Sequence, residues 1–173
     1  IGSNFVRMVL SGRLPGLEHA DVTVYDALTY SGTLTNLPQL DQTERLQFIE
    51  GDIRDSQSVA RAIAGHDAVV HFAAESHVDR SVLNSRVFVD TNVLGTQTLL
   101  DAALQASIPR FVHISTDEVY GSIDEGSWSE DEPLLPNSPY AASKAASDLL
   151  VRSYFVTHGL NTCITRCSNN YGT

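Results

Sequence analysis

The chain has 173 residues, of which 42% are hydrophobic and 18% charged, a composition that suits one compact domain with a core and excludes a disordered segment. The net charge of -10 gives an acidic surface, which repels the phosphates of nucleic acids and anionic lipids. The sequence contains no apolar run of the ~18 residues that a membrane span needs, and no signal-peptide pattern opens it. We therefore expect no nucleic-acid partner, no membrane partner and a cytoplasmic location.

Helical and strand patterns alternate along the sequence. A helix begins near Gly2, before the first strand. The predicted strands cover residues 22–26, 46–50, 68–72, 110–115 and 161–167. The further predicted helices cover 57–64, capped by Asp55 or Ser56, then 87–105, and 139–158, which starts at Ser138-Pro139 and stops at Gly159. Residues 121–136, which are acidic and contain Gly, Ser and Pro, form a surface loop.

This alternation predicts the α/β class: a doubly wound parallel sheet, Rossmann-like, with helices on both faces. The two cysteines, Cys163 and Cys167, lie in the last predicted strand. Four residues of strand separate them by about 13 Å, which is too far for a disulfide. They have no paired histidines nearby, so we predict reduced thiols and no metal site.

Doubly wound sheets bind ligands at the carboxyl ends of their strands, where several acidic residues stand. Asp26 ends the first predicted strand, 24 positions after Gly2, as does the acidic residue that binds a ribose in a dinucleotide site. Asp52 follows the next strand and could accept a hydrogen bond from an adenine amino group. For both residues the alternative is a local cap or turn, and the pattern alone does not decide between the two.

Tyr140 and Lys144 are four residues apart on the predicted helix 139–158, and thus on one helix face. A free tyrosine has a pKa of about 10, and a nearby ammonium favours the phenolate and lowers the pKa. Such a phenolate is a suitable base for the hydroxyl proton when a carbinol is oxidised. The alternative is a chance pair on an amphipathic helix.

The residues after the strand 110–115 strengthen the catalytic interpretation. Ser115 and Thr116 place hydroxyl groups at this strand end, where they could hold the oxygen of the same substrate. The adjacent Asp117 and Glu118 would repel each other in a dry cleft, which raises at least one pKa. An acid and a base with separated pKa values suit a β-elimination. The alternative is a solvated turn.

Four segments together resemble the dTDP-glucose 4,6-dehydratases, nucleotide-sugar-modifying enzymes of the extended short-chain dehydrogenase/reductase type. They are FAAESHVDRS (72–81), STDEVYG (115–121), SPYAASK (138–144) and CSNNYG (167–172). The resemblance covers essentially the whole chain apart from the variable loop 121–136. It implies an NAD-dependent lyase of deoxysugar biosynthesis with dTDP-glucose as substrate.

The resemblance also implies a role for each residue of the catalytic set. Tyr140, supported by Lys144, would deprotonate the glucose 4-hydroxyl while hydride passes to NAD+, and Thr116 would bind the 4-oxygen. Glu118 would then remove the C5 proton and Asp117 would protonate the C6 hydroxyl, which leaves as water. Return of the hydride to C6 would give dTDP-4-keto-6-deoxyglucose.

Further residues are implied in binding by the same resemblance. Those expected to bind NAD, with Tyr140 and Lys144, are Ile1, Asp26, Ala27, Leu28, Thr29, Asp52, Ile53, Phe72, Ala73, Ala74, Ser76, Thr91 and Asn170. Those expected to bind the nucleotide-sugar are Ser76, Thr116 and Asn169.

Two other functions compete with this one. A UDP-sugar 4-epimerase or a decarboxylase of the same fold would share the Tyr/Lys helix, but an epimerase has no need for Asp117 and Glu118. An NAD-sensing protein without chemistry would tend to lose the Tyr/Lys pair or the acids, and this sequence has both.

We expect residues 1–173 to form one NAD-binding domain that lacks its first strand and glycine turn, because Ile1 stands where such an element should already have passed. The C-terminal domain that would grip the nucleotide is expected to lie beyond this chain. The 173 residues alone are therefore expected to be inactive and poorly folded. The resemblance also implies a homodimer.

Overall fold

The computed structural model describes residues 1–37 and 43–171, so Gly172 of the last motif lies outside the described residues. The chain divides into two compact units, residues 1–52 and the remainder from Ile53 onward. We describe each unit by itself. Among the described residues, no helix is both long enough and apolar enough to cross a membrane.

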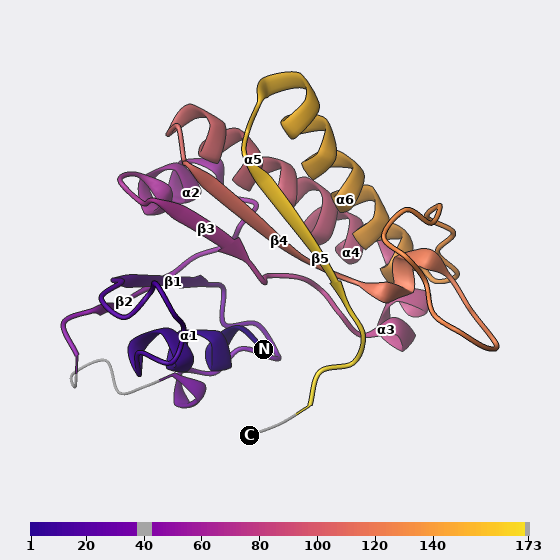
Figure 1. The fold of residues 1–173 in the computed structure, drawn as a ribbon, viewed down its shortest axis with the longest axis horizontal. Helices are drawn as coiled ribbons and strands as arrows, with labels where there is room; N and C mark the ends of the chain where they lie inside the picture. The colour runs from indigo at the N-terminus through magenta and orange to yellow at the C-terminus, as the bar shows by residue number, and fades with distance from the viewer. Residues whose placement is uncertain (38–42, 172–173) are drawn as a thin grey trace. The chain divides into compact units, whose positions relative to one another are not determined.

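The first unit contains a helix and a two-stranded parallel sheet (Figure 1). Helix α1 covers Gly2–Leu10, strand β1 covers Val22–Asp26, a 3₁₀ helix covers Leu34–Asn36, and strand β2 covers Leu46–Glu50. Val22 pairs with Leu46 and Asp26 with Glu50. Because the strands are parallel, the residues that follow Asp26 and Glu50 lie at one edge of this sheet.

The second unit is built on a three-stranded parallel sheet in the order β3-β4-β5. The strands are β3 (Ala68–His71), β4 (Arg110–Thr116) and β5 (Thr162–Cys167). The helices are α2 (Ser56–Ile63), α3 (Val78–Leu83), α4 (Ser85–Phe88), the π-helix Val89–Leu94, α5 (Gly95–Gln105), the 3₁₀ helix Asp117–Tyr120 and α6 (Pro139–His158). All five predicted strands are confirmed to within two residues, whereas α3 was not predicted.

Helix ends follow the expected chemistry. The Asp55 carboxylate accepts hydrogen bonds of 3.0 Å from the amides of Gln57 and Ser58, and so caps α2. The Ser138 hydroxyl accepts 3.1 Å from the amide of Ala141 at the start of α6. Gly159 ends α6 with a φ of 70°, a left-handed conformation that glycine adopts without steric cost.

The predicted helix 87–105 is not a continuous α-helix. Its middle, Val89–Leu94, is π-helical, between α4 and α5. The hydroxyls of Thr96 and Ser147 both donate to the carbonyl of Asn92, at 2.6 and 2.5 Å. This carbonyl would bond the amide four residues on in a regular helix, so competing hydroxyls account for the wider turn.

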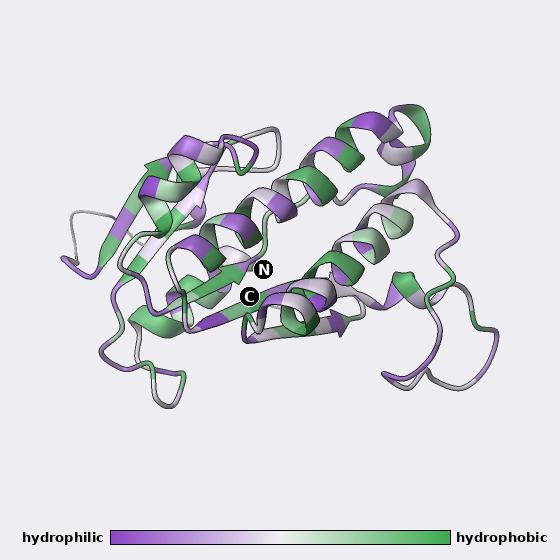
Figure 2. Cartoon of the chain, turned by 90° about the horizontal axis from the view of Figure 1, so that it is seen from above, coloured by the Kyte–Doolittle hydropathy of each residue, from purple (hydrophilic) through white to green (hydrophobic). Residues whose placement is uncertain are grey.

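Helices α2, α5 and α6 contact one another in sequence order and form a layer on one face of the three-stranded sheet (Figure 1). Phe88 of α4, Leu100 of α5, Phe111 of β4 and Val151 of α6 are fully buried. The helices carry hydrophobic and hydrophilic stretches, as amphipathic helices do (Figure 2). The α/β class with parallel sheets is confirmed, and the second helical layer on the opposite face stays a prediction.

Candidate active site

The carboxyl ends of strands β4 and β5 lie together in the second unit. Thr116, the last residue of β4, pairs with Cys167, the last residue of β5, and β3 pairs with β4 up to His71. The segments after all three strands therefore start at one edge of the sheet. The motifs 72–81, 115–121 and 167–172 all begin within or directly after these strand ends.

Helix α6 brings Tyr140 and Lys144 to this edge. Both side chains are buried, with exposed fractions of 9% for Tyr140 and 4% for Lys144. The Lys144 ammonium donates a 2.7 Å hydrogen bond to the carbonyl of Ile114 in β4. The Tyr140 phenol makes a hydrogen bond with the Thr116 hydroxyl, which lowers the phenol's pKa. The predicted base and the predicted hydroxyl partner thus meet.

The expected fall in the pKa of Tyr140 is wrong for this structure. Burial, followed by the negative charge of Glu118, raises the pKa of Tyr140 to about 12. Burial also lowers the pKa of Lys144 to about 8, and the charges of Asp148 and Cys167 oppose that change. Removing the phenol and the ammonium from water disfavours the charged form of each group, an effect that the spacing of Tyr140 and Lys144 along the sequence does not contain.

The two acids follow β4 in the 3₁₀ helix Asp117–Tyr120. The Thr116 hydroxyl caps this helix, accepting 3.2 Å from the amide of Glu118, and lies 3.3 Å from an Asp117 carboxylate oxygen to which it donates. Both acids are half-buried. Burial, and then the charge of Asp117, raises the pKa of Glu118. The expectation that one pKa of the pair is raised is confirmed.

Asn92 is a buried residue of this site that the sequence analysis missed. Its amide nitrogen donates to the carbonyl of Glu75 at 2.9 Å and to the Ser143 hydroxyl at 2.8 Å, and its amide oxygen accepts 2.8 Å from the amide of Glu75. Asn92 therefore holds the segment after β3 against helix α6. An asparagine within an apolar helical pattern was the available signal.

The predicted cofactor residues near Asn92 differ in exposure. Phe72, Ala73 and Ala74 are half-buried, Ser76 is exposed, and Thr91 is half-buried beside Asn92 in the π-helix. After β5, Asn169 and Asn170 are exposed. The Asn170 amide donates to the Cys167 sulfur at 3.3 Å and to the carbonyl of Ser168 at 3.0 Å. Cys163 and Cys167 are free thiols.

The first unit holds most of the predicted adenosine-binding residues. The Asp26 carboxylate accepts 2.7 Å from the amide of Leu28, which has a positive φ of 48°. Ala27 and Leu28 are half-buried, while Thr29 and Ile1 are exposed. The Tyr25 hydroxyl donates 3.0 Å to the carbonyl of Asp52. Asp26 is the last residue of β1 and Asp52 follows β2, so both lie at one edge of this sheet. Ile53 belongs to the second unit, where it is buried.

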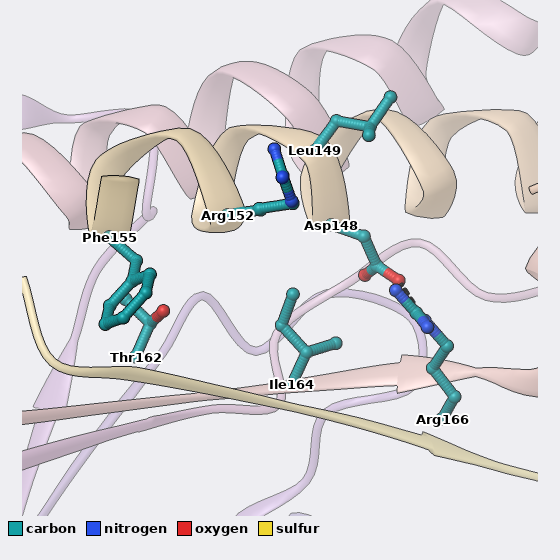
Figure 3. Close-up of a pocket in the computed structure, with 7 residues that line it drawn as sticks. All are labelled: Asp148, Leu149, Arg152, Phe155, Thr162, Ile164 and Arg166. Carbon is teal, nitrogen blue, oxygen red and sulfur yellow. Dashed lines mark hydrogen bonds and ion pairs between the residues drawn. The ribbon is translucent and has the colours of Figure 1, made fainter. Parts of the chain in front are cut away.

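A pocket of about 240 Å³ lies between α6 and β5, lined in part by Leu149, Phe155 and Ile164 (Figure 3). Its charged groups include Asp148 and Arg166, which bond each other at 2.7 Å. None of the predicted site residues lines it. We therefore place the site at the strand ends, where the hydroxyls and carboxyls meet. Among the described residues, no group of three or more His, Cys, Asp or Glu side chains could hold a metal ion.

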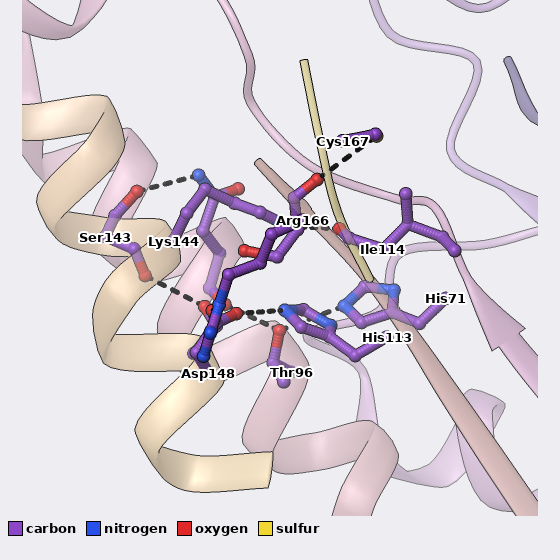
Figure 4. Close-up of polar contacts among 12 residues, drawn as sticks. His71, Thr96, His113, Ile114, Ser143, Lys144, Asp148, Arg166 and Cys167 are labelled. Carbon is purple, nitrogen blue, oxygen red and sulfur yellow. Dashed lines mark hydrogen bonds and ion pairs between the residues drawn. The ribbon is translucent and has the colours of Figure 1, made fainter. Parts of the chain in front are cut away.

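A second group of buried polar side chains lies close to Lys144 (Figure 4). The His71 ring bonds the Thr96 hydroxyl at 2.9 Å, and His113 lies 3.4 Å from the Asp148 carboxylate. Burial is the main cause that lowers the pKa values of both histidines. Burial alone would raise the pKa of Asp148, but the nearby His113, Arg166 and Ser115 together lower it. None of these roles was predicted from the sequence.

Comparison with known proteins identifies the family of this chain and several of its relatives. A family model described as GDP-mannose 4,6 dehydratase matches residues 1–173. The dTDP-glucose 4,6-dehydratase of Streptomyces niveus is 56% identical over 172 residues, which are 99% of this chain and 51% of that protein. The chain spans about half the length of the curated relatives it matches.

Solved structures of nucleotide-sugar enzymes also resemble this chain. The crystal structure of DesIV, a dTDP-glucose 4,6-dehydratase from Streptomyces venezuelae with NAD bound, is 59% identical with a TM-score of 0.96, over 99% of this chain and 53% of DesIV. UDP-glucose 4-epimerase from Thermus thermophilus, also in complex with NAD, is 32% identical with a TM-score of 0.81, over 95% of this chain and 50% of the epimerase. The expected resemblance to dTDP-glucose 4,6-dehydratases is confirmed, and the chain belongs to the GDP-mannose 4,6 dehydratase family.

Proposed function

We propose that this chain is the NAD-binding part of a nucleotide-sugar 4,6-dehydratase that converts dTDP-glucose to dTDP-4-keto-6-deoxyglucose. The observation that carries the proposal is the meeting of Tyr140, Thr116 and the Asp117–Glu118 pair at the end of β4. The relatives named above support dTDP-glucose as substrate, NAD as cofactor and an enzyme about twice the length of this chain. A homodimer is proposed from the same resemblance.

The residues present fit NAD. The Asp26 carboxylate, held by the amide of Leu28, suits the two hydroxyls of an adenosine ribose. In the second unit, Lys144 and Tyr140 offer a cation and a hydroxyl to the nicotinamide end, and residues 72–74 offer half-buried backbone and apolar side chains. NAD+, when bound, supplies the acceptor and later the donor of one hydride.

The side chains of this chain would move the protons of the reaction. Tyr140 would take the proton of the sugar 4-hydroxyl, and Thr116 would hold the same oxygen. Because the pKa of Tyr140 is about 12, the positive charge of Lys144 one turn away is needed to stabilise the phenolate. The Ile114 carbonyl holds the Lys144 ammonium beside the strand end for that task.

Glu118 and Asp117 would carry out the elimination. The 4-ketone acidifies the C5 proton, which Glu118 would remove. Burial already raises the pKa of Glu118, which makes it a stronger base for carbon. Asp117 would protonate the C6 hydroxyl, which departs as water, and Glu118 would return a proton to C5 after hydride has reached C6.

A 4-epimerase is the second candidate, because epimerase structures share the fold at lower identity. It needs the oxidation at C4 but no carboxyl pair for C5 and C6. The half-buried Asp117 and Glu118 beside Thr116 therefore favour the dehydratase.

The test uses the full-length enzyme, meaning a protein of its relatives' length that carries this chain. It is incubated with dTDP-glucose and, separately, with GDP-mannose, and the 4-keto-6-deoxyhexose is measured by its absorbance in base. Product from dTDP-glucose supports the proposal, and a 4-epimer without absorbance overturns it. Glu118→Gln should block elimination while C4 oxidation stays detectable as reduced nicotinamide.

A further inference from the structure

Asp148 lies two helical turns after Tyr140 and one turn after Lys144, on the same face of α6. Its side chain is 1% exposed, so its charge is removed from water. Arg166, from β5, donates a 2.7 Å hydrogen bond from Nε to the Asp148 carboxylate. A buried ion pair therefore joins helix α6 to strand β5 (Figure 4).

The same guanidinium also binds the turn that carries the two acids. Arg166 Nη1 donates 2.7 Å to the Tyr120 hydroxyl, and the guanidinium carbon lies 5.1 Å from the centre of the Tyr120 ring. Tyr120 is the last residue of the 3₁₀ helix that begins with Asp117 and Glu118. Its ring stacks on Trp128 at 5.9 Å, so the contact extends into the loop 121–136.

A buried ion pair is weak evidence for stability, because the cost of desolvating two charges offsets their attraction. The pair can instead fix the orientation of its neighbours, because a planar guanidinium holds its hydrogen-bond partners at set angles. Here the two partners are Asp148, on the helix of the base, and Tyr120, on the turn of the acids. Arg166 is the side chain that joins them.

We propose that Arg166, anchored on Asp148, is a positioning residue that fixes the Asp117–Tyr120 turn against helix α6 and so keeps Glu118 near Tyr140. The inference rests on the proposed dehydratase function. Arg166 acts through Tyr120 and touches neither substrate nor cofactor in this role. Its loss should slow the elimination, which depends on Glu118, more than the C4 oxidation, which depends on Tyr140 and Thr116.

The sharpest variant is Tyr120→Phe in the full-length enzyme, because it keeps the ion pair and removes only the hydroxyl that Arg166 binds. A misplacement on the order of 1 Å costs about 100-fold in rate, so we expect elimination to slow by about 10- to 100-fold relative to C4 oxidation. Tyr154→Phe is the matched control. Tyr154 lies farther along α6, and its hydroxyl bonds Asp101 of α5. Its removal should leave both steps unchanged.

Arg166→Met tests the anchor itself, but it leaves the buried Asp148 charge without its guanidinium partner. The double variant Asp148→Asn/Arg166→Met removes both charges together and tests the anchor by hydrogen exchange alone, because the charge of Asp148 also supports Lys144, on which C4 oxidation depends. A second readout is independent of turnover: hydrogen exchange of the peptides covering 117–136 should be faster in Tyr120→Phe and in the double variant than in Tyr154→Phe. These peptides include the amide of Leu135, which bonds the carbonyl of Val119.

The outcomes separate the two proposals. If the unmodified enzyme makes no 4-keto-6-deoxy product, the proposed function fails. If it makes product and Tyr120→Phe slows both steps equally, or neither, the positioning role of Arg166 is overturned. Unchanged hydrogen exchange in residues 117–136 would overturn it as well.

Discussion

Lys144 donates its 2.7 Å hydrogen bond to the backbone carbonyl of Ile114, two residues before the end of β4. This single bond joins the helix that carries the proposed base to the strand that carries Thr116 and the two acids. A buried ammonium with a backbone partner is costly to maintain, because burial lowers its pKa to about 8. The bond to Ile114 holds the Lys144 ammonium beside Tyr140, where its positive charge would stabilise the phenolate.

Lys144→Met should therefore stabilise the full-length enzyme at neutral pH while abolishing turnover. Below pH 8 the wild-type enzyme carries the buried charge, which lowers its free energy of unfolding by at most about 3 kcal/mol, at about 1.4 kcal/mol per pKa unit. The variant avoids this cost but loses the hydrogen bond to Ile114, which is worth about 1 kcal/mol. Between pH 8 and 10.5 the folded chain has released this proton while the unfolded chain still holds it, so wild-type stability rises with pH and the gain should shrink.

Urea unfolding at pH 7 and at about pH 10 measures this difference. Arg152→Met removes an exposed cation from the same helix and serves as the control. A lower unfolding midpoint for Lys144→Met at pH 7 would contradict the expected cost of the buried charge.

Tyr140→Phe should lower the rate of dehydration of dTDP-glucose by about 10²- to 10⁴-fold, the usual contribution of a general base. The phenyl ring fills the same buried space, so the thermal unfolding midpoint should be preserved. Steady-state turnover and thermal unfolding check the two parts. A variant that keeps a tenth or more of the wild-type rate would rule out Tyr140 as the base.

The buried imidazoles predict a loss of stability in mild acid. Burial lowers the pKa of His71 well below 6.5, so the unfolded chain takes up a proton at a pH where the folded chain does not. As the pH falls below 6.5, the free energy of unfolding should drop by up to about 1.4 kcal/mol per pH unit for this histidine. Burial lowers the pKa of His113 too, which adds to the effect.

His71→Gln keeps a polar group beside Thr96 and removes the titration. Urea midpoints measured from pH 7 to pH 5 should therefore fall less steeply for His71→Gln than for the wild type. His158→Gln, which removes an exposed imidazole from the end of α6, is the matched control. Equal slopes for His71→Gln and the wild type would show that His71 is not buried in its neutral form.

Asn92→Ala should destabilise the enzyme by about 3 kcal/mol, because it removes three hydrogen bonds worth about 1 kcal/mol each. Thr98→Ala, which removes one exposed side-chain bond from α5 to the carbonyl of Leu94 in the π-helix, should change stability by less than about 0.5 kcal/mol. Denaturant midpoints compare the two. Equal effects would mean that Asn92 does not hold the segment after β3 to helix α6.

Local patterns in the sequence predicted the ends of helices where a single capping residue sets the end. Asp55 caps α2, and Ser138, Pro139 and Gly159 bound α6 as expected, because a cap depends on neighbours within four residues. The pattern of residues 87–105 predicts a regular helix, but the carbonyl of Asn92 bonds the hydroxyl of Ser147, 55 positions away, as well as that of Thr96. A window along the sequence does not contain that contact.

The sequence by itself determined the strand ends and the residue types at the site: the Tyr140–Lys144 spacing, the hydroxyl of Thr116 and the adjacent acids. Only the tertiary structure decided the direction of the Tyr140 pKa shift, the bond of Lys144 to Ile114, and the bonds of Arg166 to Asp148 and to Tyr120, which lie 18 and 46 positions away from it. The physical reason is that protonation and pairing depend on burial and on distant partners. Periodicity and spacing report only which face of an element a residue occupies.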